Sequence, residues 1–324
     1  MFTLIDEFPV NENGLMILAR YIQNLRTYDV VSFVFLAFLS ILNLLFYTRV
    51  AEWWILILLN IVVSGLIIYF AYRFSDLPAN KPLRIIRDWY PVGMVIYVFQ
   101  QIYYMVYPIR GRDYDELLIE IDYWMFGVNP TEWMAQFSHP VLTEFLQIVY
   151  ATFYFLFLIA GYEMYRRKLY REFYYFILIV VYGFYLSYIG YFLVPAIGPR
   201  FTLHDFHTKN EDLPGLFLTD IIRELLNRGE SIPPGVANPE DYVHRDVFPS
   251  GHTQLMLVLM YGVWLYRLHC RKIMYVIGVL MIFSTVYLWY HYVIDLIASV
   301  VFFAVTIATA PYIDRWWKGR VIRR

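Results

Sequence analysis

The sequence predicts an all-α polytopic membrane protein with about eight transmembrane helices. Of its 324 residues, 60% are hydrophobic and only 16% are charged, whereas a soluble domain carries about 25% charged residues. The hydrophobic residues fall into long runs, each close to the roughly 20 residues that a helix needs to cross a hydrocarbon core. Basic residues gather in alternate connections between these runs. Together these observations predict a bundle of membrane-spanning helices.

The longest polar connection between the predicted spans is the loop over residues 195–250. The spans cover about 30–47, 53–72, 91–109, 141–162, 174–194, 251–268, 273–290 and 292–312. Residues 1–29 have apolar residues at helical spacing and predict an amphipathic segment on the membrane surface. A second amphipathic helix is expected before Gly127, with Asp113, Glu116 and Glu120 on its solvated face.

The distribution of basic residues predicts how the chain is oriented in the membrane. With both termini in the cytoplasm, the inner segments hold 18 of the 26 basic residues, as the positive-inside rule expects. The short turns at 166–171 and 267–272 determine the predicted orientation, because the rule applies best to short loops. The loop 195–250 then lies on the extracytoplasmic face. A net charge of −1 gives no reason to expect a nucleic-acid partner.

The most informative stretch runs from Val247 to Thr253, where the long loop becomes an apolar helix. Ser250 is expected to be the N-cap of that helix. The first amides of the helix then face the loop without intrahelical partners and can bind an anion such as phosphate. Gly251 allows a ligand to approach the backbone, and the imidazole of His252 can move a proton.

Two further elements are expected on the same face of the membrane. His291 and Asp295 are four residues apart and share one helical face, so Asp295 can orient the imidazole for nucleophilic attack; a structural cap is the alternative. Arg200 ends the rigid stretch 194–200 and offers a guanidinium group to phosphate oxygens. The alternative for this residue is an arginine that snorkels at the membrane boundary.

These motifs resemble those of the type 2 phosphatidic acid phosphatase superfamily, the lipid phosphate phosphatases. Residues 248–253 read Phe-Pro-Ser-Gly-His-Thr, and residues 284–295 contain the His-x-x-x-Asp of another family motif. The chain departs from the pattern at Leu193, where the family has a lysine, and at Thr285, where it has an arginine. The Gly-Pro-Arg form of the first motif is similar to the inositol-phosphotransferase branch, which includes the inositol phosphorylceramide synthases.

The resemblance implies a domain plan and a role for each site residue. Residues 30–89 would form two additional transmembrane helices with a basic linker, 90–312 a six-helix catalytic core, and 313–324 a basic cytoplasmic tail. The implied catalytic residues are His291 as nucleophile, His252 as proton donor and Asp295 as the group that orients His291. The implied phosphate-binding residues are Arg200, Ser250 and Gly251. The chemistry would need no metal and no cofactor.

The remaining polar residues support weaker hypotheses. His244 and Arg245, with Asp246, precede the phosphate site and are expected to contact the substrate's head group. His204 and His207 flank Asp205 in a loop and suggest a metal site, but with no other ligands they are better explained as solvated loop residues.

The leading hypothesis for function is an integral membrane phosphatase that acts on a lipid phosphate or pyrophosphate at the outer face. It would proceed through a phosphohistidine intermediate. A phosphotransferase similar to inositol phosphorylceramide synthase uses the same intermediate and is the first alternative. A transporter of lipids or small molecules is the alternative of another class, and a non-catalytic family member is the last.

Overall fold

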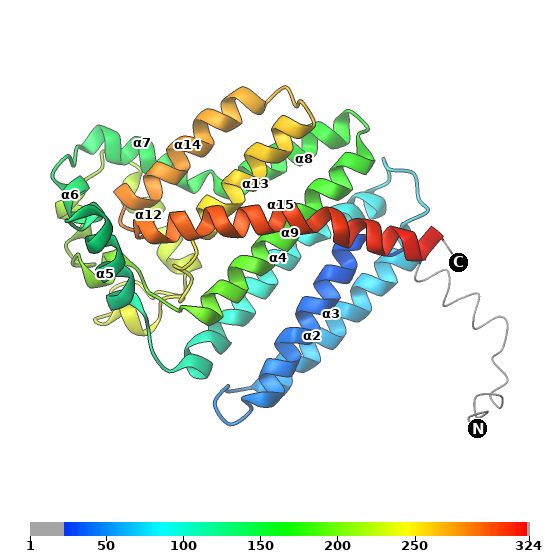
Figure 1. Cartoon of the computed structure of the whole chain (residues 1–324), viewed down its shortest axis with the longest axis horizontal. Helices are drawn as coiled ribbons and strands as arrows, with labels where there is room; N and C mark the ends of the chain where they lie inside the picture. The colour runs from blue at the N-terminus through cyan, green and yellow to red at the C-terminus, as the bar shows by residue number, and fades with distance from the viewer. Residues whose placement is uncertain (1–22, 323–324) are drawn as a thin grey trace.

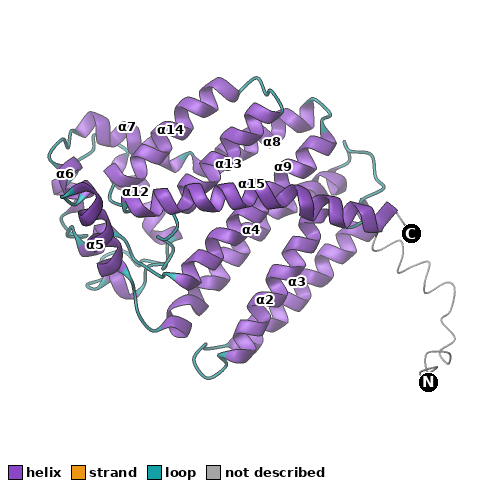
Figure 2. Ribbon diagram, in the orientation of Figure 1, coloured by secondary structure: helices purple, strands orange, loops and turns teal. Residues whose placement is uncertain are grey.

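All regular structure in the described part of the chain, residues 23–322 of this computed structural model, is helical (Figure 2). Most of the predicted amphipathic segment 1–29 lies outside the described residues. The long helices are α2 (Thr27–Leu45), α3 (Trp53–Phe74), α4 (Pro82–Arg110), α7 (Pro140–Ala151), α8 (Phe153–Arg166), α9 (Tyr170–Leu193), α13 (Gly251–Leu265), α14 (Arg271–Tyr287) and α15 (Val293–Ile322). The shorter ones are α5 (Asp115–Phe126), α6 (Pro130–Ala135), α10 (Pro199–Thr202), α11 (Lys209–Asp212), α12 (Thr219–Gly229) and a 3₁₀ turn (Pro239–Asp241).

The long helices make the chain an integral multi-pass membrane protein. Five of the described helices, α2, α3, α4, α9 and α15, are long and apolar enough to cross a membrane, and α7 with α8 makes a sixth if the bent pair is one span. At 15 and 17 residues, α13 and α14 are shorter than these five. Helix length and composition therefore show five or six spans, not the eight that the sequence predicts.

Two predicted spans differ in the structure, one beside a local hydrogen bond and one beside a contact with another helix. The fourth is bent by 50° between α7 and α8, where the hydroxyl of Thr152 donates to the Val149 carbonyl at 2.6 Å and so competes with the helical hydrogen bond. The third begins at Pro82 rather than near Pro91. Residues 82–90, predicted as linker, are therefore helical, and Arg87 is buried there in an ion pair with Asp29 of α2.

The core is built around α9 and α13. Residues on almost every side of α9 are buried, and α13 packs against α9, α14 and α15. The hairpin of α2 and α3 lies beside this core and contacts it mainly through α9 and α4 (Figure 1). Helix α13 also contacts α8, so it lies among four other helices.

The two ends of the bundle differ in character. The short helices α5, α6 and α12 gather at one end, from which α15 starts (Figure 1). Two short basic turns meet at another place, since Glu163 accepts hydrogen bonds from the backbone N–H groups of His269 and Cys270 at 2.6 and 3.0 Å. Arg167 also reaches the Arg267 carbonyl at 3.5 Å. The two turns that determine the predicted orientation therefore lie side by side.

Candidate active site

One cavity of about 180 Å³ collects polar residues that lie far apart in the sequence. One part of its wall is aromatic and comes from α4, α7, α8 and α9. The residues with charged or imidazole side chains in this wall, together with one glycine, are Arg200, Glu230, Asp246, Gly251, His252 and His291. Four of these six are residues that the sequence predicts for the site. We call this space the histidine cavity.

The imidazole rings of His252 and His291 lie with their centroids 6.0 Å apart. His252 comes from the first turn of α13, whereas His291 comes from the joint between α14 and α15. The backbone of Trp289 adopts a left-handed conformation in this joint, with φ of 64°. The N–H groups of Tyr290 and His291 then both donate to the Thr285 carbonyl, at 2.9 and 3.1 Å. This tight turn places His291 beside the start of α13.

The ring of His291 is oriented by two acceptors. Its Nδ1 lies 3.0 Å from the carbonyl oxygen of Val247 and 3.5 Å from the carboxylate of Asp295. When Nδ1 carries the proton, this N–H group donates mainly to the Val247 carbonyl oxygen, and Nε2 keeps its lone pair. Burial, followed by the nearby charge of His252, lowers the pKa of His291 well below its ordinary value. The imidazole is neutral at physiological pH, as a nucleophile must be.

Besides facing His291, Asp295 accepts hydrogen bonds from the backbone of two other segments. Its Oδ2 accepts a hydrogen bond from the N–H of Tyr292 at 2.8 Å, and its backbone carbonyl accepts one from the N–H of Ser250 at 3.3 Å. Within residues 23–322, its buried Oδ1 has no hydrogen-bond partner. Asp295 thus joins the start of α15 to the start of α13, which are the two elements that carry the histidines.

The start of α13 provides two free amides. Ser250 caps the helix by accepting a hydrogen bond from the N–H of Thr253 at 3.2 Å, as the sequence predicts. The N–H groups of Gly251 and His252 have no acceptor among the described residues. A methyl group on Gly251 would lie 2.6 Å from the Tyr191 hydroxyl oxygen. Any other residue here would require Tyr191 to move, and the free amides of this turn are suited to an anion.

The turn that carries Arg200 is fixed by an acidic residue that the sequence did not reveal. Asp115 of α5 accepts hydrogen bonds from the N–H groups of Ile197 and Gly198, at 3.0 and 2.8 Å, and another from the Tyr292 hydroxyl at 2.8 Å. Gly198 has φ of 95°, which favours glycine. Asp115 therefore holds the Arg200 turn against the joint that carries His291.

Asp122, from the same helix, has a related role. Its carboxylate accepts hydrogen bonds from the N–H groups of Val293 and Ile294, at 2.7 and 2.8 Å, and so caps the start of α15. Sequence periodicity distinguished the solvated face of this amphipathic helix but gave no means of identifying its two inward-facing carboxylates.

The guanidinium group of Arg200 is buried and already has partners. It forms an ion pair with Glu230 and a hydrogen bond with Asn227 at 3.4 Å. Glu230 and Asp246 both line the histidine cavity. Burial, with the negative charge of Glu230, raises the pKa of Asp246 to about 7, while Arg200 acts in the opposite direction. The sequence gives no indication that Glu230 belongs to the site, because only the fold brings this residue to Arg200.

His244 and Arg245, predicted to contact a head group, do not line the histidine cavity. The His244 ring stacks between Phe99 and Tyr103, with centroid distances of 4.4 and 4.5 Å, and burial lowers its pKa to about 3. Arg245 pairs with Asp113 at 3.3 Å. Both residues therefore tie the loop to its surroundings.

The loop histidines that suggested a metal site have other partners. His204 stacks on Trp289 with ring centroids 3.7 Å apart, and His207 lies 3.1 Å from the Ala237 carbonyl. Within the described part of the chain, no three histidine, cysteine, aspartate or glutamate side chains are grouped to hold a metal ion.

Leu193 and Thr285 stand where the motifs described above have a lysine and an arginine. The Leu193 side chain is exposed and the Thr285 side chain is buried.

This arrangement defines a helical membrane protein with a paired-histidine, arginine and helix-terminus site. The sequence model of the PAP2 superfamily matches residues 116–309, which is more than half of the chain. The chain therefore belongs to the PAP2 superfamily, whose members are generally metal-independent enzymes that act on phosphate esters. Comparison with curated proteins and with solved structures finds no significant match.

Proposed function

We propose that this protein is a membrane phosphatase that acts on a lipid phosphate or pyrophosphate through a phosphohistidine on His291. The observation that carries the proposal is the position of His252 and His291, with ring centroids 6.0 Å apart in one cavity with Arg200. One tetrahedral phosphoryl group fits between two rings at this separation. Family membership supports a phosphate-ester substrate.

The proposed reaction has two steps. The Nε2 lone pair of His291 forms a bond to phosphorus while the ester P–O bond breaks, and His252 passes a proton to the departing lipid oxygen. Arg200 and the amides of Gly251 and His252 neutralise the charge on the remaining phosphoryl oxygens. In the second step the now neutral His252 takes a proton from a water molecule while the water oxygen forms a bond to phosphorus and the P–Nε2 bond breaks. Phosphate is released, and both histidines return to their starting states. Asp295 and the Val247 carbonyl keep the imidazole in the reactive tautomer.

Binding of the substrate has to change one contact. Because Glu230 forms an ion pair with Arg200, an incoming phosphate must displace this carboxylate or share the guanidinium group with it. Helix α12, which ends just before Glu230, has exposed apolar residues that include Ile221 and Leu225. We expect α12 to lie at the membrane interface and to move when a lipid head group enters.

A phosphotransferase of the inositol phosphorylceramide synthase type is the second candidate, and a specific observation favours it. The histidine cavity contains the carboxylates of Glu230 and Asp246, which repel a phosphate dianion but accept hydrogen bonds from hydroxyl groups. A polyol acceptor would use both. The same phosphohistidine would then be released by the polyol hydroxyl instead of water.

The proposal includes eight spans with the histidine cavity on the extracytoplasmic side. Counting α13, α14 and the bent pair of α7 and α8 as spans, together with the five long helices, accounts for all eight. The short basic turns lie together, as expected for a cytoplasmic face. The polar site forms where α5, α6 and α12 gather, whereas a transporter usually places its binding site near the middle of the membrane.

The test uses purified protein with several lipid phosphates and pyrophosphates, with and without inositol. Release of free phosphate supports the phosphatase, and formation of an inositol-containing lipid supports the transferase. His291→Ala should lower turnover at least about a thousandfold while the protein still folds and inserts. His269→Ala, an exposed histidine distant from the cavity, should retain turnover. Normal activity in His291→Ala would reject the mechanism.

A further inference from the structure

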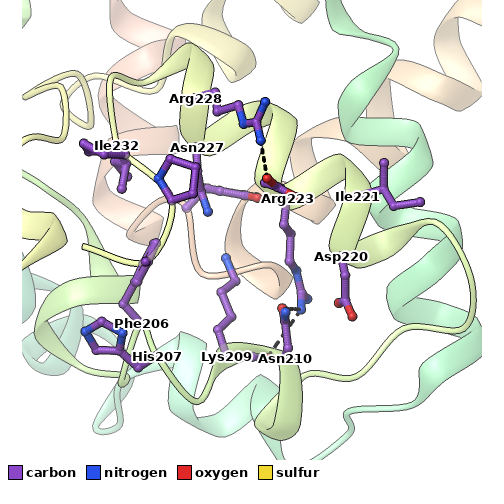
Figure 3. A pocket seen from close by; sticks show the side chains of 15 residues that line it. Phe206, His207, Lys209, Asn210, Asp220, Ile221, Arg223, Asn227, Arg228 and Ile232 are labelled. Carbon is purple, nitrogen blue, oxygen red and sulfur yellow. Dashed lines mark hydrogen bonds and ion pairs between the residues drawn. The ribbon is translucent and has the colours of Figure 1, made fainter. Parts of the chain in front are cut away.

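A second cavity lies beside the histidine cavity and has a different lining. It encloses about 410 Å³ and is lined by residues of α11, α12 and the loop around Pro233, and by Tyr290. Figure 3 shows the side chains that line it. Its charged side chains are Lys209, Arg223 and Arg228 against Asp220 and Glu224. We call this space the lysine cavity.

Lys209 is the unusual member of this set. Its side chain is only 5% exposed and extends into the cavity (Figure 3). Its ammonium nitrogen lies 4.1 Å from the centroid of the Tyr290 ring, and no carboxylate in residues 23–322 forms a salt bridge with it. A buried cation without a counter-charge is costly, so an anion beside Lys209 would be strongly favoured.

The charges around Lys209 increase this preference. Burial, then the neighbouring guanidinium groups of Arg223 and Arg200, lower the pKa of Lys209 well below its ordinary value, and Glu230 opposes them weakly. A bound anion would restore the protonated form. Glu224 does not serve as that anion, because it pairs with Arg228 at 2.5 Å.

Arg223 shapes the cavity rather than offering a free guanidinium group. It donates to the carbonyl of Leu213 and the side chain of Asn210, both at 2.8 Å, and to Gln147 of α7 at 3.3 Å. These bonds hold α11 and α12 together around the ammonium group. Lys209 is therefore the side chain that can be changed with the least disturbance to the wall.

The lysine cavity and the histidine cavity share a wall. Tyr290 lines both of them, and its ring centroid lies 5.0 Å from the Arg200 guanidinium carbon. Asn227 lines the lysine cavity and accepts the hydrogen bond from Arg200. A group held by Lys209 and a phosphoryl group held by Arg200 would thus both lie near the Tyr290 ring.

We propose that the lysine cavity is a second anion subsite, which holds a phosphate group adjacent to the one that reacts. This inference rests on the proposed function and narrows it: the preferred substrate is a lipid whose head group carries two phosphates. Lys209 then supplies positive charge that Leu193 and Thr285 do not provide. Free inorganic phosphate has the same chemistry, so the test must distinguish the two sources.

The kinetic test compares a lipid monophosphate with the diphosphate of the same lipid. Lys209→Met removes the charge and keeps a chain of similar length, and it should raise KM for the diphosphate about tenfold or more, the effect of one charge-assisted hydrogen bond. kcat, and KM for the monophosphate, should change less than twofold. Lys209→Arg should recover most of the diphosphate KM, and Lys318→Met, an exposed lysine far along α15, should match the unaltered protein.

A binding measurement separates failure of the subsite from failure of the proposed function. Calorimetry with inorganic phosphate and full-length protein needs no turnover, and Lys209→Met should weaken binding about tenfold while Lys318→Met does not. If no lipid is turned over but binding still depends on Lys209, the subsite stands and the proposed function fails. If turnover is normal and Lys209→Met affects neither lipid, or affects both equally, the subsite is overturned.

Discussion

Asp246 is the side chain whose chemistry the sequence left open and the structure clarifies. Its carboxyl group shares the histidine cavity with Glu230 and Arg200, and burial raises its pKa to about 7. Below that pH the group is neutral and tolerates a phosphate. Above it, the ionised group repels one. Ionisation of Asp246 should therefore control how well the cavity accepts an anion.

The first residue-scale prediction concerns the pH dependence of substrate binding. KM for a lipid phosphate should rise as the pH increases through about 7, on the order of tenfold if one carboxylate faces the phosphate at an effective dielectric constant of about 20. Asp246→Asn cannot ionise and should show a weaker rise. Steady-state kinetics of both proteins over the same pH series provide the measurement. Parallel profiles would show that another group is responsible.

The same ionisation has a defined effect on stability. The carboxyl group keeps its proton to a higher pH in the folded chain than in the unfolded chain, so the folded state binds more protons between about pH 4 and about 7. The contribution of Asp246 to the free energy of unfolding falls as the pH rises through this window and is constant above it. Asp246→Asn should remove that decrease, which denaturation of both proteins at a series of pH values would measure.

At the scale of elements, the residues in the first turn of α13 are chosen partly by local helix capping and partly by packing against another helix. Ser250 caps the helix by a local rule. The requirement for glycine at position 251 comes instead from Tyr191 of α9, whose hydroxyl oxygen lies where a methyl group would be placed. The free amides of this turn therefore depend on the packing of α13 against α9.

This packing predicts the effect of a single methyl group. Gly251→Ala should lower kcat/KM roughly 100-fold, because a shift of about 1 Å at a phosphate-binding turn is enough to misplace the reacting group. Tyr191→Phe in the same chain removes the clashing oxygen and should restore most of the activity. Gly93→Ala, in a helix position with nothing within 4 Å, is the matched control. Failure of the double variant to recover would contradict this explanation.

At the scale of the whole molecule, the basic turns and the histidine cavity occupy different parts of the bundle. The turns between α8 and α9 and between α13 and α14 lie side by side, while α15 begins among the short helices α5, α6 and α12 (Figure 1), of which α12 lines the cavity. A membrane protein with this distribution of charge should present the basic turns to the cytoplasm.

Labelling of single cysteines tests that orientation. Cys270→Ser removes the native thiol, and exposed positions in the two regions are Arg166 and Glu240. In sealed right-side-out vesicles, a membrane-impermeant maleimide should label Glu240→Cys and leave Arg166→Cys unmodified until detergent is added. The reverse pattern would place the histidine cavity in the cytoplasm and overturn the proposed localisation.

Much of the helical framework follows from local sequence, and one of its two exceptions has a tertiary cause. Apolar runs predict α2, α3 and α9 closely, because burial of apolar length in a membrane is a local property. The break at Thr152 and the early start of α4 at Pro82 were not predicted. Polar residues can remain in an apolar helix when distant partners satisfy them, as Asp29 does for Arg87.

By itself, the sequence determined that this chain is a helical membrane protein, and it identified Arg200, His252 and His291 as residues to examine. Hydrophobic length and motif spacing are local and can be read without coordinates. Only the tertiary structure decided that Glu230 pairs with Arg200, that Val247 lies closer than Asp295 to Nδ1 of His291, and that Lys209 is buried without a counter-charge. Each of these depends on contacts between segments far apart in the chain, and the energy of a buried charge depends on every group that the fold brings to it.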